Sequence, residues 1–119
     1  MITKESIDAA LTAHSQWKKR LQEAVEKGKS EFQVNVVQKD NACQFGQWLN
    51  TLSGNDTKSE DFIKVKHLHA EFHKTAASIL ELALSDKKPE ALKKLEFGGA
   101  YGQITGKLVL ALNSWKNKI

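Results

Sequence analysis

Apolar residues recur at alternating steps of three and four in two long stretches of the chain, which is the spacing of one buried helix face. In residues 3–27 the stripe is Ile7, Ala10, His14, Trp17, Leu21 and Ala24, broadened by Leu11 and Val25. In residues 57–84 it is Phe62, Val65, His69, Phe72, Ala76, Ile79 and Ala83. The pattern predicts two long amphipathic helices, each with a histidine on its buried face.

End signals frame both predicted helices. Thr3 can cap the first helix, Glu5 lies in its first turn, and Gly28 is placed to end it. Residues 53–56, Ser-Gly-Asn-Asp, read as a turn before the second long helix. The following Thr-Lys-Ser-Glu at 57–60 matches a capping box, which predicts Thr57 as the N-cap.

A third long helix is predicted from about Lys88 to Trp115, with Pro89 in its first turn. Its apolar residues are Leu92, Leu95, Phe97, Tyr101, Ile104, Leu108, Leu112 and Trp115. Gly98, Gly102 and Gly106 repeat every four residues. Such a row predicts a groove in which another backbone or a bulky side chain lies close, and the alternative is a kink near residues 98–99.

Between the two long stretches lies a shorter predicted helix, from about Asn41 to Leu52, with Asn41 as its cap and Gln44 completing a capping box. Its apolar residues are Phe45, Trp48, Leu49 and Leu52. Residues 29–40 look strand-like by residue type, but a lone strand would leave its backbone groups unpaired. We therefore expect a partly helical connection that lays Phe32 and one or two valines against the core.

Together these elements predict an all-α fold: an antiparallel four-helix-bundle-like domain with three long helices and a short cysteine-bearing helix. The 119 residues are expected to form a single domain, residues 1–119. Composition agrees, because 40% apolar and 27% charged residues are ordinary for a soluble globular protein and there is only one proline.

Charge and cysteine content narrow the expected partners and compartment. The net charge is +4, but the lysines are interleaved with acids and form no cluster with aromatic residues, so we expect no nucleic-acid partner. No apolar run approaches 18 residues, so we expect no membrane span. A single cysteine cannot form an internal disulfide, and the N-terminus lacks the apolar core of a signal peptide. We therefore expect a cytoplasmic protein.

Four residues could bind a metal. Cys43 falls in the first turn of the short helix, where free N–H groups and the helix dipole favour a thiolate. His69 and His73 are four apart, so they lie one turn apart on the same side of their helix. His14 lies on the buried stripe of the first helix, whereas His67 is rotated by roughly 200° from His69 and is excluded. One thiolate and three imidazoles form a zinc ligand set, although a lone cysteine or a lone histidine is more often only a packed core residue.

The spacing of these residues resembles a known family. The motif Cys-x-Phe-Gly-x-Trp-Leu at residues 43–49 is followed about twenty residues later by His-x-x-x-His at 69–73, with His14 on the preceding helix. This pattern, together with Gly-Gly-x-Tyr-Gly at 98–102, resembles the chemoreceptor zinc-binding (CZB) domain. The resemblance implies that His14, Cys43, His69 and His73 coordinate one zinc ion.

The resemblance also implies a role in signalling rather than catalysis. Members of this family are bacterial, cytoplasmic and often homodimeric. They are usually attached to chemotaxis receptors or diguanylate cyclases, and they sense zinc availability or oxidants such as hypochlorous acid. The sequence contains no output domain, so it is expected to be either a free-standing member or an excised domain.

A sensing mechanism also follows from the residue types. The thiolate of Cys43 is the only anionic ligand, so its oxidation would change one bond and the charge balance together. We expect the short helix to move when that bond is lost. Gly46 would leave room beside Cys43, and Phe45 and Trp48 would be the packing contacts that read out the change.

Three other functions stay open. A di-iron or oxygen-binding bundle also uses inward histidines, but it needs about five of them or several inward carboxylates, and the sequence has four histidines, one of which is predicted to face outward. A mononuclear zinc hydrolase would use the three histidines and a water, with Cys43 as a bystander, and would need a general base. Glu71 is predicted to point away from the His69 side of its helix. A metal-free helical interaction module would leave the inward polar rings unexplained.

Overall fold

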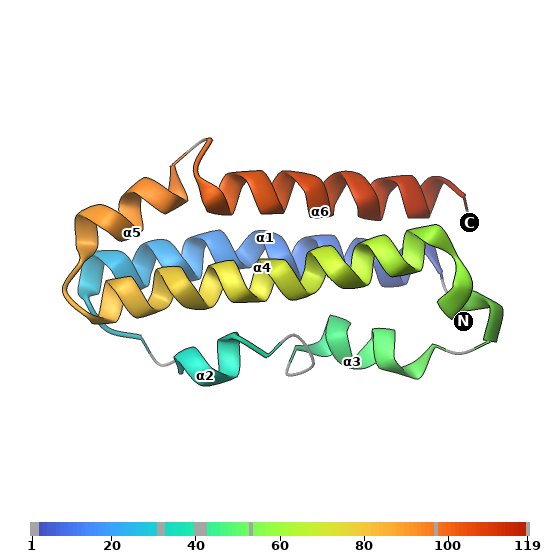
Figure 1. The fold of residues 1–119 in the computed structure, drawn as a ribbon, viewed down its shortest axis with the longest axis horizontal. Helices are drawn as coiled ribbons and strands as arrows, with labels where there is room; N and C mark the ends of the chain where they lie inside the picture. The colour runs from blue at the N-terminus through green and yellow to red at the C-terminus, as the bar shows by residue number, and fades with distance from the viewer. Residues whose placement is uncertain (1–2, 31–32, 40–42, 53, 97, 119) are drawn as a thin grey trace.

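The computed structural model describes residues 3–30, 33–39, 43–52, 54–96 and 98–118 (Figure 1). All the regular structure in these ranges is helical, which confirms the predicted all-α class. The elements are α1 (Lys4–Lys27), α2 (Val34–Val37), α3 (Gln44–Thr51), the 3₁₀ helix η2 (Gly54–Lys58), α4 (Glu60–Leu84), α5 (Lys88–Leu95) and α6 (Ala100–Asn117).

The helices form four rows in which consecutive rows run in opposite directions (Figure 1). The first row is α1, the second α2 followed by α3, the third α4, and the fourth α5 followed by α6. Consequently α1 and α4 run in the same direction. α4 packs against all the other helices, so it is the central element of the bundle. Among the described helices, none has the length and apolarity needed to cross a membrane.

The predicted ends of the first helix are confirmed. The Thr3 hydroxyl accepts a hydrogen bond from the Ser6 N–H at 3.1 Å, which satisfies one of the open donors of the first turn. Gly28 has a φ of 66°, and its N–H donates to the Ala24 carbonyl at 2.8 Å. Glycine adopts this left-handed conformation without the strain that a Cβ would impose, so the chain turns here.

The predicted cap of the second long helix is wrong by two residues. The N-cap of α4 is Ser59, whose hydroxyl accepts from the Phe62 N–H at 3.1 Å. Thr57 lies in η2, and its hydroxyl donates to the Gly54 carbonyl at 2.8 Å. The hydroxyl predicted to cap the helix is therefore used by the preceding turn, and the next hydroxyl along the chain caps α4 instead.

The predicted third long helix is two helices, so the alternative of a break near residues 98–99 holds. Gly98 has a φ of 87°, and α6 begins at Ala100. A Cβ on Gly99 would lie 2.6 and 2.7 Å from the carbonyl oxygens of Lys93 and Lys94. Gly99 thus permits a close backbone contact, whereas a Cβ on Gly106 would meet nothing within 4 Å, so the predicted groove does not extend to Gly106.

The core consists of the faces that the apolar periodicity predicts. All seven residues of the α4 stripe are buried, and so are five of the six α1 stripe residues. The sixth, Trp17, is half-buried and packs against the core. In the connection, Val37 is buried as expected, while Phe32 lies outside the described residues.

Candidate metal centre

The parallel course of α1 and α4 brings the three inward histidines to the same level of the bundle. His14 lies ten residues after the start of α1, and His69 and His73 lie nine and thirteen residues after the start of α4. Both helices start at the same end of the molecule (Figure 1) and rise by about 1.5 Å per residue. The three rings therefore meet near the middle of the fold.

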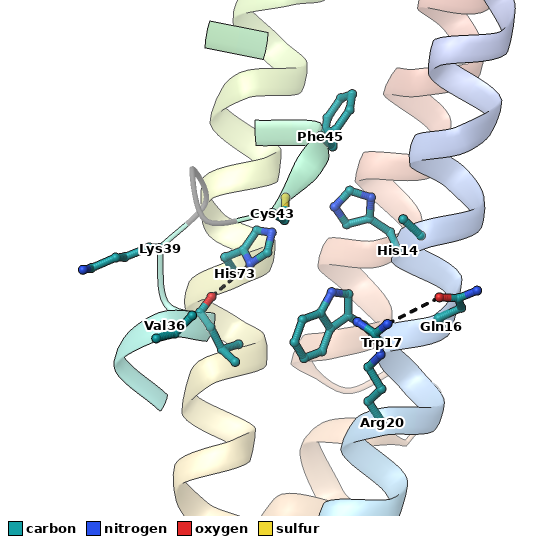
Figure 2. Close-up of a pocket in the computed structure, with 11 residues that line it drawn as sticks. His14, Gln16, Trp17, Arg20, Val36, Lys39, Cys43, Phe45 and His73 are labelled. Atoms are coloured by element: carbon teal, nitrogen blue, oxygen red, sulfur yellow. Dashed lines mark hydrogen bonds between the residues drawn. The ribbon is translucent and has the colours of Figure 1, made fainter. Parts of the chain in front are cut away.

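α3 completes the group with a thiol. Cys43, His14, His69 and His73 each offer one ligand atom, and these four atoms all lie within 4.8 Å of one another. The Cys43 Sγ is 3.2 Å from the His69 Nε2, which is 3.0 Å from the His73 Nε2. Figure 2 shows His14 and His73 on either side of Cys43. The structure therefore places all four predicted ligands together.

Backbone carbonyls fix the orientation of two of the imidazoles. The His14 Nδ1 lies 2.7 Å from the Ala10 carbonyl, and the His73 Nδ1 lies 3.0 Å from the Val37 carbonyl. A carbonyl only accepts, so each Nδ1 must carry the proton and each Nε2 is left with a lone pair. Metal-binding histidines have this arrangement, in which the outer nitrogen donates to a carbonyl or carboxylate. The geometry of His14 and His73 therefore fits a metal bound through Nε2.

Burial keeps the His14 and His69 imidazoles neutral. His14, His69 and His73 are 4%, 0% and 2% exposed. Burial lowers the pKa of His14 to about 4, although the Ala10 carbonyl opposes the shift, and the nearby His73 lowers it further. Burial, followed by the charges of His73 and His14, lowers the pKa of His69 to about 2. Metal binding requires neutral imidazoles, so near neutral pH these two rings have the charge state that metal binding requires.

His69 differs from the other two histidines. Its Nδ1 is buried and has no hydrogen-bond partner among the described residues. Because the His73 Nε2 carries a lone pair, a hydrogen bond across the 3.0 Å between the two Nε2 atoms requires the proton on His69. Of the two rings, His69 is thus the donor in this hydrogen bond.

Cys43 is the N-cap of α3, one position before the first turn in which it was predicted. Its Sγ accepts a hydrogen bond from the Gly46 N–H at 3.3 Å. The helix therefore begins at Gln44 rather than at Asn41, which lies outside the described residues. The N-cap position still directs the sulfur at the positive end of the helix, which favours the thiolate.

The aromatic residues of α3 pack against the cluster. The ring centroid of Phe45 lies 5.6 Å from that of His14 and 5.0 Å from that of His69, both edge to face. Trp48 stacks on Phe45 at 5.6 Å and lies 6.1 Å from Trp115 on α6. The two residues predicted to read out the site thus connect its rings to the last helix.

The remaining histidine and the candidate general base lie outside the cluster. The His67 Nε2 is 3.1 Å from a carboxylate oxygen of Glu71, and their side chains are 72% and 49% exposed. Both predicted outward orientations are confirmed. Within the described part of the chain, the group of three or more metal-binding side chains close enough to share an ion consists of His14, Cys43, His69 and His73, and it contains no carboxylate.

A comparison with protein families identifies this arrangement. A family model described as the chemoreceptor zinc-binding domain matches residues 14–80, more than half of the chain. The chain belongs to this family. The matched region begins at His14 and contains the other three residues of the cluster. Searches of the curated proteins and of the solved structures found no match.

Sequence reasoning missed the groups that orient the CZB histidines. The Ala10 and Val37 carbonyls are backbone atoms, so no residue type signals them. The Ala10 contact is local, since His14 reaches back four residues along α1. The Val37 contact spans 36 residues. The related signal in the sequence is the expectation that one or two valines of the connection pack against the core.

Proposed function

We propose that His14, Cys43, His69 and His73 bind one zinc ion, and that the chain is a sensory domain of bacterial signal transduction. The observation that carries the proposal is the convergence of three imidazole nitrogens and one Sγ, with two of the imidazoles already oriented by carbonyls. Zinc would hold the thiolate and the imidazoles together without redox chemistry of its own. Four protein ligands complete a tetrahedral set, which is typical of a closed site rather than a catalytic one.

Cys43 is the group through which the site would respond. It supplies the only anionic ligand, and it is the one member of the cluster that is not fully buried. Loss of zinc and oxidation of the sulfur would both break the bond between the sulfur and the ion. The proposed stimuli are therefore zinc availability and oxidants such as hypochlorous acid, which act on the same residue.

The response would pass through α3. The helix is eight residues long, and Phe45 and Leu49 bury its inner face against the core. Because Cys43 caps α3 and Phe45 packs on His14 and His69, release of the sulfur would loosen both its first turn and its packing. Trp48 would carry the change to Trp115 on α6. The long helices would keep their places.

Metal content tests the site. The purified chain is expected to hold one zinc by elemental analysis, and the Cys43→Ala and His69→Ala variants are expected to bind it weakly or not at all. His67→Ala is the matched control, because it removes an exposed histidine of the same helix. Zinc undiminished in Cys43→Ala would favour a three-histidine hydrolase site, and iron in place of zinc would favour the di-iron class.

Hydrogen exchange tests the response of α3. In zinc-loaded conditions, Cys43→Ala is expected to speed amide exchange across residues 44–52, while the middle of α4 stays protected. Unchanged exchange in residues 44–52 would show that α3 does not depend on the sulfur. We further propose that the chain lies in the cytoplasm, forms a homodimer and couples to a chemotaxis receptor or diguanylate cyclase. Size measurement tests the homodimer, pull-down of the two partner classes tests the coupling, and cell fractionation tests the location.

A further inference from the structure

A partly open cavity of about 480 Å³ lies next to Cys43, between α1 and α2 (Figure 2). Its lining includes Cys43, His14 and His73, with Trp17 on the α1 side and Val36 on the α2 side. The volume is within the range of small-molecule pockets in proteins, about 300–1,000 Å³. The cavity therefore connects three residues of the metal centre to the surface.

Two groups of the fold contact the sulfur. The His69 Nε2 lies 3.2 Å from the Sγ, and the Gly46 N–H donates to the sulfur from the α3 side at 3.3 Å. The three histidines are almost fully buried, whereas Cys43 is partly exposed. A small molecule that approaches the cluster from the cavity thus meets the sulfur before it can meet the His69 ring, which does not line the cavity.

A second cavity provides an internal control. It has a volume of about 250 Å³ and is lined by Ala9, Ala13, Phe45 and Trp48, among others, but not by Cys43. Phe45 lines both cavities, and its ring packs edge to face with the His14 ring. A molecule in the second cavity would meet Phe45 rather than the sulfur.

We propose that the larger cavity is the entrance through which small, uncharged thiol-reactive oxidants, such as peroxides and hypohalous acids, reach Cys43 in the folded chain. The inference rests on the proposed function in taking the Cys43 thiolate as the responding group. The sulfur attacks the oxygen of the oxidant, an S–O bond forms and the bond from that oxygen to its leaving group breaks. The sulfur is oxidised to a sulfenic acid that keeps the oxidant's proton, and the leaving group departs as the reduced anion.

The rate at which iodoacetamide alkylates Cys43 tests the entrance. In this reaction the sulfur forms an S–C bond and iodide leaves, so the rate reports access to the thiolate. Val36 is 48% exposed on the cavity wall, and Ala9 is exposed on the second cavity. In the full chain freed of metal by a chelator, Val36→Trp is expected to slow alkylation several-fold and Val36→Ala to speed it. Ala9→Trp is expected to leave the rate unchanged.

Equal rates in Val36→Trp and Ala9→Trp would overturn the inference. A route through global unfolding is checked with Gly99→Ala, which is expected to destabilise the fold away from the cavity because its Cβ would overlap backbone carbonyl oxygens. That variant is expected to react as fast as wild type, and acceleration in proportion to its unfolding constant would show that Cys43 reacts from the unfolded chain.

Zinc content measured on the same variants separates this inference from the proposed function. If the alkylation rates change in the Val36 variants but no zinc binds, the inference about the entrance holds and the zinc assignment is wrong. If zinc binds normally and the alkylation rates do not change in the Val36 variants, the inference about the entrance is wrong but the zinc assignment stands.

Discussion

Acid is expected to unfold the metal-free chain through its buried imidazoles. Burial lowers the pKa of His14 to about 4 from its usual 6.5. Above pH 6.5 the ring is neutral in both states, so pH has no effect through this group. Between pH 6.5 and 4 the unfolded chain binds a proton that the folded chain does not, so stability falls as pH falls. Below pH 4 the loss from His14 levels off.

The size of the effect follows from the two pKa values. At pH 5 the unfolded ring is almost fully protonated and the folded ring almost fully neutral, which gives a loss of about 2 kcal/mol from His14 alone. His69, whose pKa lies lower still, adds to the loss in the same direction. Against a typical folding free energy of about 5–15 kcal/mol, this is a large fraction.

Urea unfolding in the presence of a chelator, at pH 7 and pH 5, measures the effect. Wild type is expected to lose about 2 kcal/mol more than His14→Leu between the two pH values. His67→Leu is the control, because it removes an imidazole whose side chain is 72% exposed. It should lose as much as wild type. If His14→Leu also loses as much as wild type, His14 is not held neutral by burial and the reasoning is refuted.

Three further outcomes are expected. Gly99→Ala should cost about 1–3 kcal/mol or more by urea unfolding, because its Cβ would overlap backbone carbonyls that cannot move aside. Gly106→Ala should instead stabilise the chain by up to about 1 kcal/mol, because the added methyl meets nothing in a helix interior; a loss equal to that of Gly99→Ala would contradict the placement of the helix break. Zinc at a free concentration a hundredfold above its dissociation constant should stabilise wild type by about 2.7 kcal/mol in thermal unfolding. Cys43→Ser should lose most of this gain, and an undiminished gain would remove the sulfur from the ligand set.

The residues of the site could be predicted from the sequence more accurately than the exact ends of the helices. His14 and His69 fall on apolar stripes, and the helical period alone turns them inward. That the two helices run in the same direction follows from the intervening row, α2 with α3, which returns the chain to the starting end. The three histidines also fall near the middle of their predicted helices, so their rings could be expected to meet.

The sequence predictions failed where the same local pattern was compatible with two structures. Thr57 and Ser59 both have side chains that can cap a helix, and the capping-box pattern selects the first, whereas the turn from Gly54 uses the Thr57 hydroxyl. In the same way, periodicity cannot separate one glycine-containing helix from two. The break before Ala100 depends on the backbone contact at Gly99, which is a tertiary property.

The central claim is that one zinc ion is held by three imidazoles and the Cys43 thiolate, and X-ray absorption at the zinc edge tests it most directly. The account predicts three nitrogen neighbours at about 2.0–2.1 Å and one sulfur at about 2.3 Å in the zinc-loaded chain, with the sulfur shell lost in Cys43→Ala. A wild-type spectrum with nitrogen and oxygen neighbours but no sulfur would contradict the account, because the zinc would then be bound without Cys43.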